Sequence, residues 1–283
     1  MTDSIAETSP RDPARIADKA LKASARLWFL VAVIGMLIFV YYIVAFYSGS
    51  SVQGGVRALN RYLPGEAIGN VAFAMHILLA IIIMIGGPLQ LTLGAIITGD
   101  GPRRLSPKFR ARVRPFHHWN GRIYMLTAVT ASLAGLYMVW FPGTVGGVVG
   151  AIGISLDAVL IMIFAAMAVR YAIARDIATH RRWALRLFMV VSAVYFNRVG
   201  LNLWILLTGG VGIDFGTFTG PFMTFWVFGQ YLVPLAILEL YLRTQDRAGT
   251  TGKFAMAGGL FVVTALMGVG IFAVTTMSWL PRL

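Results

Sequence analysis

The sequence predicts an all-α protein, a bundle of seven transmembrane helices that fills a lipid bilayer. Of its 283 residues, 58% are hydrophobic and only 12% are charged, and the mean hydropathy is +0.76. Soluble domains carry about a quarter charged residues. A soluble chain of this length cannot bury so much apolar surface, so the surrounding solvent is predicted to be lipid.

Seven apolar runs are long enough to span, because one helical crossing takes about 20 residues. The first run has no small-residue cleavage site and is interpreted as a retained helix rather than a signal peptide. We expect residues 1–24 to form a mobile cytoplasmic segment, with "RIADKALKASAR" as a candidate extension of the first helix, and residues 25–283 to form the membrane domain. The runs are roughly 27–47, 68–97, 117–141, 147–173, 181–208, 221–242 and 254–278.

The positions of the basic residues predict the direction of the helices. With the N-terminus in the cytoplasm, the cytoplasmic ends hold five cations before the first run, seven from Arg103 to Arg122, five from Arg170 to Arg186, and three between the last two runs, which makes 20 of the 24. The positive-inside rule then places the C-terminus outside. Membrane lipids with anionic headgroups at the cytoplasmic face are the expected partners of the net charge of +13, rather than nucleic acid. Nothing in the sequence identifies a protein partner.

Glycine, proline and other small residues predict how the helices pack. Gly86-Gly87-Pro88 interrupts the second run and Pro234 the sixth; a simple kink is favoured over a broken helix that lines a site. Small residues at helical spacing let two helices approach closely in lipid, so the second to fifth runs, about 68–208, are expected to form the core. The two stripes are His76, Ala80, Ile83, Gly87, Gln90, Gly94 and Gly121, Ala128, Ala131, Gly135.

Three charged or histidine residues lie deep inside apolar runs, away from the ends. Asp157 lies near the middle of the fourth run, Arg198 in the outer half of the fifth, and His76 in the outer half of the second. A charge at such depth costs at least about 2.5–3.5 kcal/mol, so it needs a partner or a purpose. Tyr195, Arg198 and Asn202 share one helix face. We expect Asp157 to pair with Arg198, with His76 and Asn202 nearby, as a structural ion pair or as a functional pocket.

Two similar motifs occupy the predicted cytoplasmic starts of the third and fifth helices, "HHWNGRIY" at 117–124 and "HRRWALRLF" at 180–188. A helix N-terminus already carries partial positive charge. Arginines placed there, Arg122 in the first motif and Arg186 in the second, are favourable only if an anionic group faces them. Lipid headgroups, with the two motif tryptophans as interfacial anchors, are the simplest answer. The other candidates are Glu239, at the height of Arg122 or Arg186, Asp176, and the acidic group of a ligand.

The motif histidines also suggest a b-type haem. His117 or His118 with His180 would supply two imidazoles from different helices, and the nearby arginines would hold the propionates. Two observations weigh against haem: these histidines lie at the membrane edge, and His76 has no histidine partner at its own depth. The sequence shows no motif for other catalytic chemistry. It has no cysteine, no phosphate-binding glycine loop with lysine, no HExxH and no Ser-His-Asp arrangement.

The same residues resemble a bacterial family of multi-pass membrane proteins known as domain of unknown function 2306. The resemblance covers about 68–208 and rests on His76, Gly87-Pro88, Gln90, the basic loop "GPRRLSPKFRARVR", both motifs and Arg198. One departure is His118, where the family usually has arginine. The resemblance implies a bacterial inner-membrane protein and brings no established activity. The positions that it makes first candidates for testing are His76, Gln90, His117, Gly121, Arg122, His180, Trp183, Arg186 and Arg198.

The sequence favours a non-catalytic binding protein, a sensor or accessory subunit that recognises a small or lipid-like anionic molecule. Two alternatives stay open: a haem b or quinone redox protein, and a proton-linked transporter with Asp157, Arg198 and His76 as its relay. The two motifs are parallel rather than inverted, which lowers the transporter hypothesis. The candidate ligand-binding residues are His76, Gln90, His117, Arg122, Asp157, His180, Arg186, Arg198 and Asn202, with His117 and His180 as the haem ligands.

Overall fold

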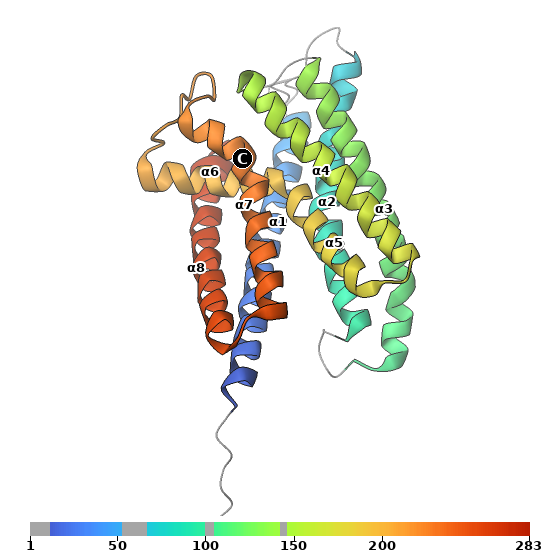
Figure 1. Ribbon diagram of the computed structural model, residues 1–283. Helices are drawn as coiled ribbons and strands as arrows, with labels where there is room; N and C mark the ends of the chain where they lie inside the picture. Colours follow the sequence, from blue (N-terminus) through green and yellow to red (C-terminus); the bar gives the residue numbers. More distant parts are fainter. Residues whose placement is uncertain (1–11, 53–66, 100–104, 142–145) are drawn as a thin grey trace, which may run out of the picture.

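The computed structural model describes residues 12–52, 67–99, 105–141 and 146–283, and this part of the chain is almost entirely helical (Figure 1). One isolated antiparallel bridge, between Asp214 and Thr219, is the only β pairing in these residues. The helices are α1 (Pro13–Val52), α2 (Ala67–Thr98), α3 (Pro107–Trp140), α4 (Gly147–Ile173), α5 (Ile177–Val191), α6 (Ala193–Thr208), α7 (Pro221–Arg247) and α8 (Thr250–Val274), followed by a π-helical turn η2 (Thr275–Trp279) and a 3₁₀ turn η3 (Leu280–Arg282).

The predicted all-α membrane architecture is confirmed. Six helices of the described chain, namely α1, α2, α3, α4, α7 and α8, are each long and apolar enough to cross a bilayer. The predicted fifth span is a bent pair, because α5 and α6 meet at an angle of 53° and make a seventh crossing if they count as one. The bend lies at Ser192, whose backbone leaves the helical region (φ −85°, ψ 7°).

Two other helices differ from the predicted boundaries. The α1 helix begins at Pro13, so the segment proposed as its extension is indeed helical, while residues 1–11 lie outside the described chain. The α3 helix begins at Pro107, ten residues before the predicted start at 117, and is capped by the Ser106 hydroxyl, which accepts the N–H of Phe109 at 3.2 Å. Both α2 and α7 continue through their internal prolines, so neither helix is broken there.

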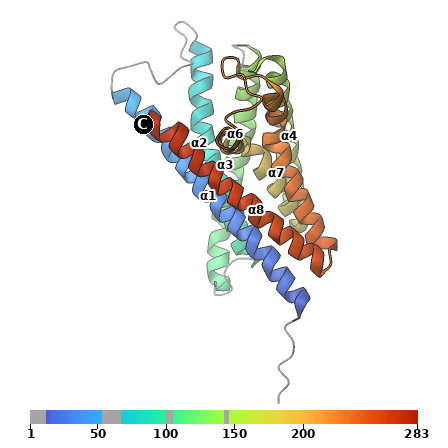
Figure 2. The same ribbon diagram turned by 90° about the vertical axis from the view of Figure 1, so that its left-hand side faces the viewer.

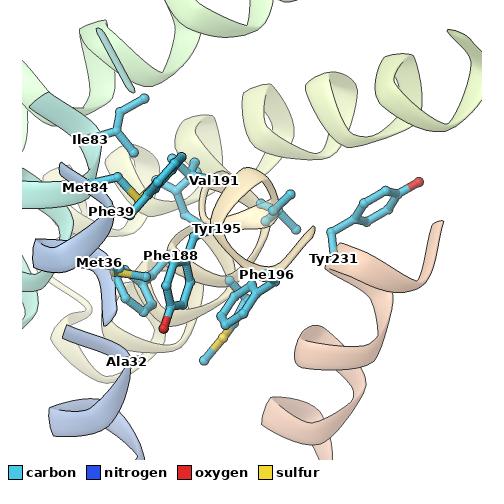
Figure 3. Packing of buried hydrophobic residues seen from close by; sticks show 14 of the residues in the cluster. Ala32, Met36, Phe39, Ile83, Met84, Phe188, Val191, Tyr195, Phe196 and Tyr231 are labelled. Atoms are coloured by element: carbon cyan, nitrogen blue, oxygen red, sulfur yellow. The ribbon is translucent and has the colours of Figure 1, made fainter. Parts of the chain in front are cut away.

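The helices form two groups that α5, α6 and α7 join. Figure 1 shows α2, α3 and α4 together on one side and α1 with α8 on the other. In Figure 2, α1 and α8 run side by side in the same direction, and they share one of the most extensive interfaces, together with α2–α3 and α4–α5. The hydrophobic core draws side chains from every helix, including Met36 and Phe39 of α1 (Figure 3). The predicted outer helices therefore contribute to the core as well.

The α6 helix lies across the bundle rather than along it (Figure 1). Glycines on its neighbours permit this crossing. Tyr195 packs against Gly35 of α1, and a Cβ on Gly270 of α8 would lie only 2.8 Å from the carbonyl oxygen of Val199. Close backbone approach of this kind replaces the hydrophobic effect as the main source of helix association in lipid.

The direction of the bent pair can be tested directly because the chain has no cysteine. Ala174 lies in the turn before α5 and Thr217 in the loop after α6, and both are exposed. If α5–α6 crosses the membrane, an impermeant maleimide will label Thr217→Cys in intact cells and Ala174→Cys only after permeabilisation, as the positive-inside rule predicts. Labelling of both from the same side would show instead that α5–α6 is a re-entrant pair.

Candidate binding site

The α2 and α3 helices pack in one antiparallel register in which a glycine faces each large polar side chain. A Cβ on Gly121 would lie 2.7 Å from Nε2 of Gln90, and a Cβ on Gly87 would lie 3.1 Å from the hydroxyl of Tyr124. Substituting either glycine would therefore push the polar group away. The small-residue stripes predicted from the sequence are confirmed, and we call this interface the α2–α3 seam. Its facing pairs are Gly94 with His117, Gln90 with Gly121, Gly87 with Tyr124, and His76 with Gly135.

A chain of hydrogen bonds runs through the seam. Asn120 Nδ2 donates to the carbonyl oxygen of Gly86 and to Oε1 of Gln90, both at 2.9 Å. Gln90 then presents Nε2 to Nε2 of His117 at 3.4 Å. Because the amide nitrogen of Gln90 can only donate, this network assigns the acceptor role to His117 Nε2 and the proton to its Nδ1. The chain therefore ends on an N–H group.

Two donors in the seam have no acceptor within the described residues. They are Nδ1 of His117 and the hydroxyl of Tyr124, both of which are buried; the Tyr124 side chain as a whole is 4% exposed. Leaving a buried donor unsatisfied costs about 1–3 kcal/mol. Seven residues of α-helix separate the two, about 10 Å along α3. The seam thus offers two buried donors, each facing a glycine.

His180 on α5 lies beside this group. Its Nδ1 donates to the carbonyl oxygen of Ala168 on α4 at 2.9 Å, so its Nε2 is the unprotonated nitrogen. His180 is close enough to His117 to act on it electrostatically. The structure therefore brings together Gln90, His117 and His180 of the predicted site.

The arginines of the second motif are neutralised by acids of α7. Arg186 donates through Nε and a terminal nitrogen to the two carboxylate oxygens of Glu239, at 2.5 and 3.0 Å, and its guanidinium lies 4.7 Å from the centre of the Trp183 ring. Arg182 makes the corresponding pair with Asp246 at 2.7 and 2.8 Å. The prediction that Glu239 meets Arg186 is confirmed. These pairs supply the anionic groups that the arginines of the second motif require.

Of the charged groups predicted at the two helix N-termini, only Asp176 lies at one, because Arg186 is well inside α5 (Ile177–Val191). Asp176 caps α5, where the hydroxyl and backbone N–H of Thr179 donate to its carboxylate and hold the pKa of Asp176 below its usual range. In contrast, Arg122 lies in the middle of α3, because the basic residues before it are helical too. Arg122 is exposed and stacks on Trp119, 5.3 Å from the ring centre.

The predicted pairing of Asp157 with Arg198 is not found. Asp157 lies near Tyr231 of α7, and one of its carboxylate oxygens is buried without a hydrogen bond in the described chain. Arg198 instead points to α1, where its guanidinium lies 5.4 Å from the centre of the Phe39 ring. The bend at Ser192 turns α6 away from α4 and causes this difference.

The other intramembrane residues occupy separate interfaces. His76 faces Gly135 across the seam, so the relay of Asp157, Arg198 and His76 that a transporter would use is not assembled. Asn202 lies beside Arg198, as predicted: its Nδ2 donates to the carbonyl oxygen of Arg198 at 2.9 Å, and its Oδ1 accepts from Ser278 at 2.7 Å.

With this geometry in hand, comparison with known proteins identifies the family. Residues 73–237, more than half of the chain, match the model of a family described as predicted membrane protein (DUF2306). The chain belongs to this family. No curated protein and no solved structure matches it. The matched region of this DUF2306 protein contains the seam, His180, Arg186 and Arg198.

Two residues of the candidate site, Asn120 and Tyr124, were not predicted from the sequence. Both belong to the first motif, three and seven residues after His117. This spacing places all three on one face of a helix. The signal that predicts them is the helical spacing of polar residues within the motif, in addition to the spacing of the small residues.

The close approach at Gly121 makes a stability prediction for this DUF2306 protein. Gly121→Ala will displace the Gln90 amide and break its bonds to Asn120 and His117, at a cost of about 2 kcal/mol for two hydrogen bonds, which lowers Tm by several degrees. The matched control is Gly258→Ala on α8, whose added Cβ meets no atom within 4 Å and which favours the helix. Intrinsic tryptophan fluorescence during heating measures both. Equal Tm values for the two variants would contradict the seam geometry.

Proposed function

We propose that this chain is a non-catalytic binding protein of the membrane, a sensor or accessory subunit. Its ligand is a small, lipid-soluble molecule with carbonyl or carboxylate oxygens, bound between α2, α3 and α5. The positive-inside pattern and the family resemblance support a bacterial inner membrane as its location.

The single observation that carries the proposal is the pair of buried donors without acceptors, His117 Nδ1 and the Tyr124 hydroxyl. A seam that served packing alone would satisfy its polar groups internally, as Asn120 and Gln90 do. In lipid no water competes for these donors, so each one favours a molecule that brings an oxygen to it.

The electrostatics of the site determine the class of ligand. Arg182 and Arg186 are already paired with Asp246 and Glu239, so an anion is no longer required to neutralise them. An uncharged carbonyl and a carboxylate both satisfy an N–H or O–H donor. Acceptor oxygen on an apolar body is therefore the shared chemistry of the ligand.

Comparing the Tm of wild type with that of Tyr124→Phe tests this proposal without knowledge of the ligand. In protein extracted gently from membranes, we expect Tyr124→Phe to be less stable than wild type, because it loses a hydrogen bond to the bound molecule. After exhaustive detergent washing the order will reverse, because Tyr124→Phe then lacks the penalty of a buried, unpaired hydroxyl, about 1–3 kcal/mol. Tm in both preparations is the measurement.

Tyr137→Phe is the matched control for this experiment. Tyr137 is also on α3 but stacks on Phe141, outside the seam. The Tm of Tyr137→Phe relative to wild type should therefore be the same in both preparations. Mass spectrometry of the washed-out fraction should find a compound that wild type releases and Tyr124→Phe does not. If the order of wild type and Tyr124→Phe is the same before and after washing, the seam holds no ligand.

Haem b is a second candidate, favoured by one observation. The Nδ1 of His180 donates to a backbone carbonyl, the arrangement that fixes a metal-ligating histidine and leaves its Nε2 for the iron. His117 is the nearby imidazole that would supply the second ligand, and its Nε2 would first have to leave Gln90.

The haem hypothesis predicts a Soret band at about 410–430 nm in purified protein. His180→Ala should abolish the band, whereas substitution of the exposed His118 by Ala should leave it intact. A colourless wild-type protein that keeps its helical circular dichroism after expression with added haem precursor would end this hypothesis.

A further inference from the structure

A second polar feature lies away from the seam, where α6 crosses α1. Arg198 projects from the apolar α6 helix, and its side chain is exposed. No hydrogen bond or ion pair joins its guanidinium to any residue that the structure describes. An arginine within an apolar segment costs free energy when it has no anionic partner. Such residues in membrane proteins therefore usually have a function.

None of the seven acidic side chains that the structure describes pairs with Arg198. Three of them form ion pairs on other helices. Three more accept backbone N–H groups at the start of α1, at the cap of α5 or in a turn. Asp157, the seventh, faces α7 rather than α6. No described Asp or Glu side chain therefore neutralises Arg198. The ion-paired acids are Asp18, Glu239 and Asp246, and the local acceptors are Asp12, Asp176 and Asp214.

Aromatic side chains form a wall beneath the guanidinium. The ring of Phe39 lies under Arg198 at 5.4 Å. Phe39 and Tyr42 stack on Trp279 of η2, with ring centres 5.2 and 5.5 Å apart and planes within 16°. This wall holds the guanidinium by a cation–π contact and leaves its N–H groups pointing to other partners.

Further polar groups surround the same position. Arg282 lies in η3, directly after the η2 turn whose Trp279 stacks on Phe39. Both Arg282 and Tyr42 lie close enough to act on the charge of Arg198. The second arginine raises the positive potential instead of neutralising it. Two guanidinium groups with a phenol hydroxyl are a donor set that binds phosphate oxygens.

We propose that Arg198 and Arg282 form a binding site for the phosphate group of a phospholipid. The site lies at the end of α1 remote from the N-terminus, which the positive-inside rule places in the outer leaflet. Tyrosine, tryptophan and arginine at this level are the side chains of a membrane–water interface. The lipid tails then extend along the exposed apolar residues of α1, such as Leu37 and Val44. This site is independent of the seam ligand.

Lipid retention in nanodiscs tests the site. Wild type is reconstituted with phosphatidylcholine alone or with phosphatidylglycerol added, and native mass spectrometry counts the anionic lipids that each protein retains. We expect Arg198→Gln to retain one phosphatidylglycerol fewer and to raise the dissociation constant of that lipid by about tenfold or more, since two charge-assisted hydrogen bonds are lost. Arg198→Lys should be intermediate, because lysine keeps the charge without the planar fork.

Arg175→Gln is the matched control, since Arg175 is an exposed arginine in the turn between α4 and α5 and its loss should leave the retained lipid unchanged. Arg198→Gln removes an unpaired charge and should fold, which circular dichroism verifies. If Arg198→Gln does not fold, lipid retention by Arg198→Lys tests the site instead.

Inorganic phosphate added to phosphatidylcholine nanodiscs distinguishes a phospholipid from free phosphate as the source of the bound phosphate group. Stabilisation of wild type but not of Arg198→Gln by phosphate alone would support a soluble phosphate ligand at the same arginines. Equal retention of phosphatidylglycerol by wild type, Arg198→Gln and Arg198→Lys would overturn the site.

Discussion

Close approach of helices at glycine is the constraint on which the rest of this structure depends. Lipid tails are as apolar as leucine, so helices gain little by burying leucine against each other and associate instead through tight packing and hydrogen bonds. The α2–α3 seam shows the consequence, because Gly87 and Gly121 each leave room for one polar side chain of the opposite helix. Tyr124 and Gln90 fill these spaces. The same glycines therefore allow both the close packing of α2 against α3 and the placement of polar side chains between them.

Different interactions hold the two ends of the bundle. At the end nearer the N-terminus, ion pairs tie α5 to α7 and α8 to α1: Arg186 with Glu239, and Lys253 with Asp18. At the other end, aromatic stacking of Phe39 on Trp279 joins α1 to the chain after α8. Ion pairs of this kind need the polarisable surroundings of an interface, since fully buried pairs rarely repay the loss of water. The three described ion pairs all lie at one end, and Arg198, nearer the other end, pairs with no acid among the residues that the structure describes.

Much of the fold was readable from the sequence, because hydropathy and length measure what lipid requires of a helix. The small-residue stripes predicted the seam, and counting residues along helices placed Glu239 at the height of Arg186. The early start of α3 was missed for a clear reason. The segment "KFRARVR" is too polar to be counted as membrane-spanning, yet arginine and lysine are good helix formers. Hydropathy reports where a helix meets lipid and not where it begins.

The bend at Ser192 had no signal in the sequence, since neither proline nor glycine lies there. Its cause is tertiary: Gly35 and Gly270, on α1 and α8, let Tyr195 and Val199 approach, and α6 must turn to reach them. That turn also explains the failure of the Asp157–Arg198 pairing. A straight helix would have kept Arg198 level with α4, whereas the bent one carries it to α1.

The groups without partners follow from the same geometry. Where a glycine faces Tyr124 or His117, the neighbouring helix offers no side chain to complete the hydrogen bond; where α6 swings onto α1, Arg198 meets Phe39 instead of a carboxylate. In water such groups would be solvated at little cost. In lipid the cost persists until another molecule supplies the missing oxygen, so the unsatisfied groups of a membrane protein mark its binding sites more directly than those of a soluble one. Within the described ranges, the seam lacks acceptors for neutral donors, and the α6 crossing lacks an anion. These different deficits, at different interfaces, are the reason to assign two ligands of different chemistry to one chain.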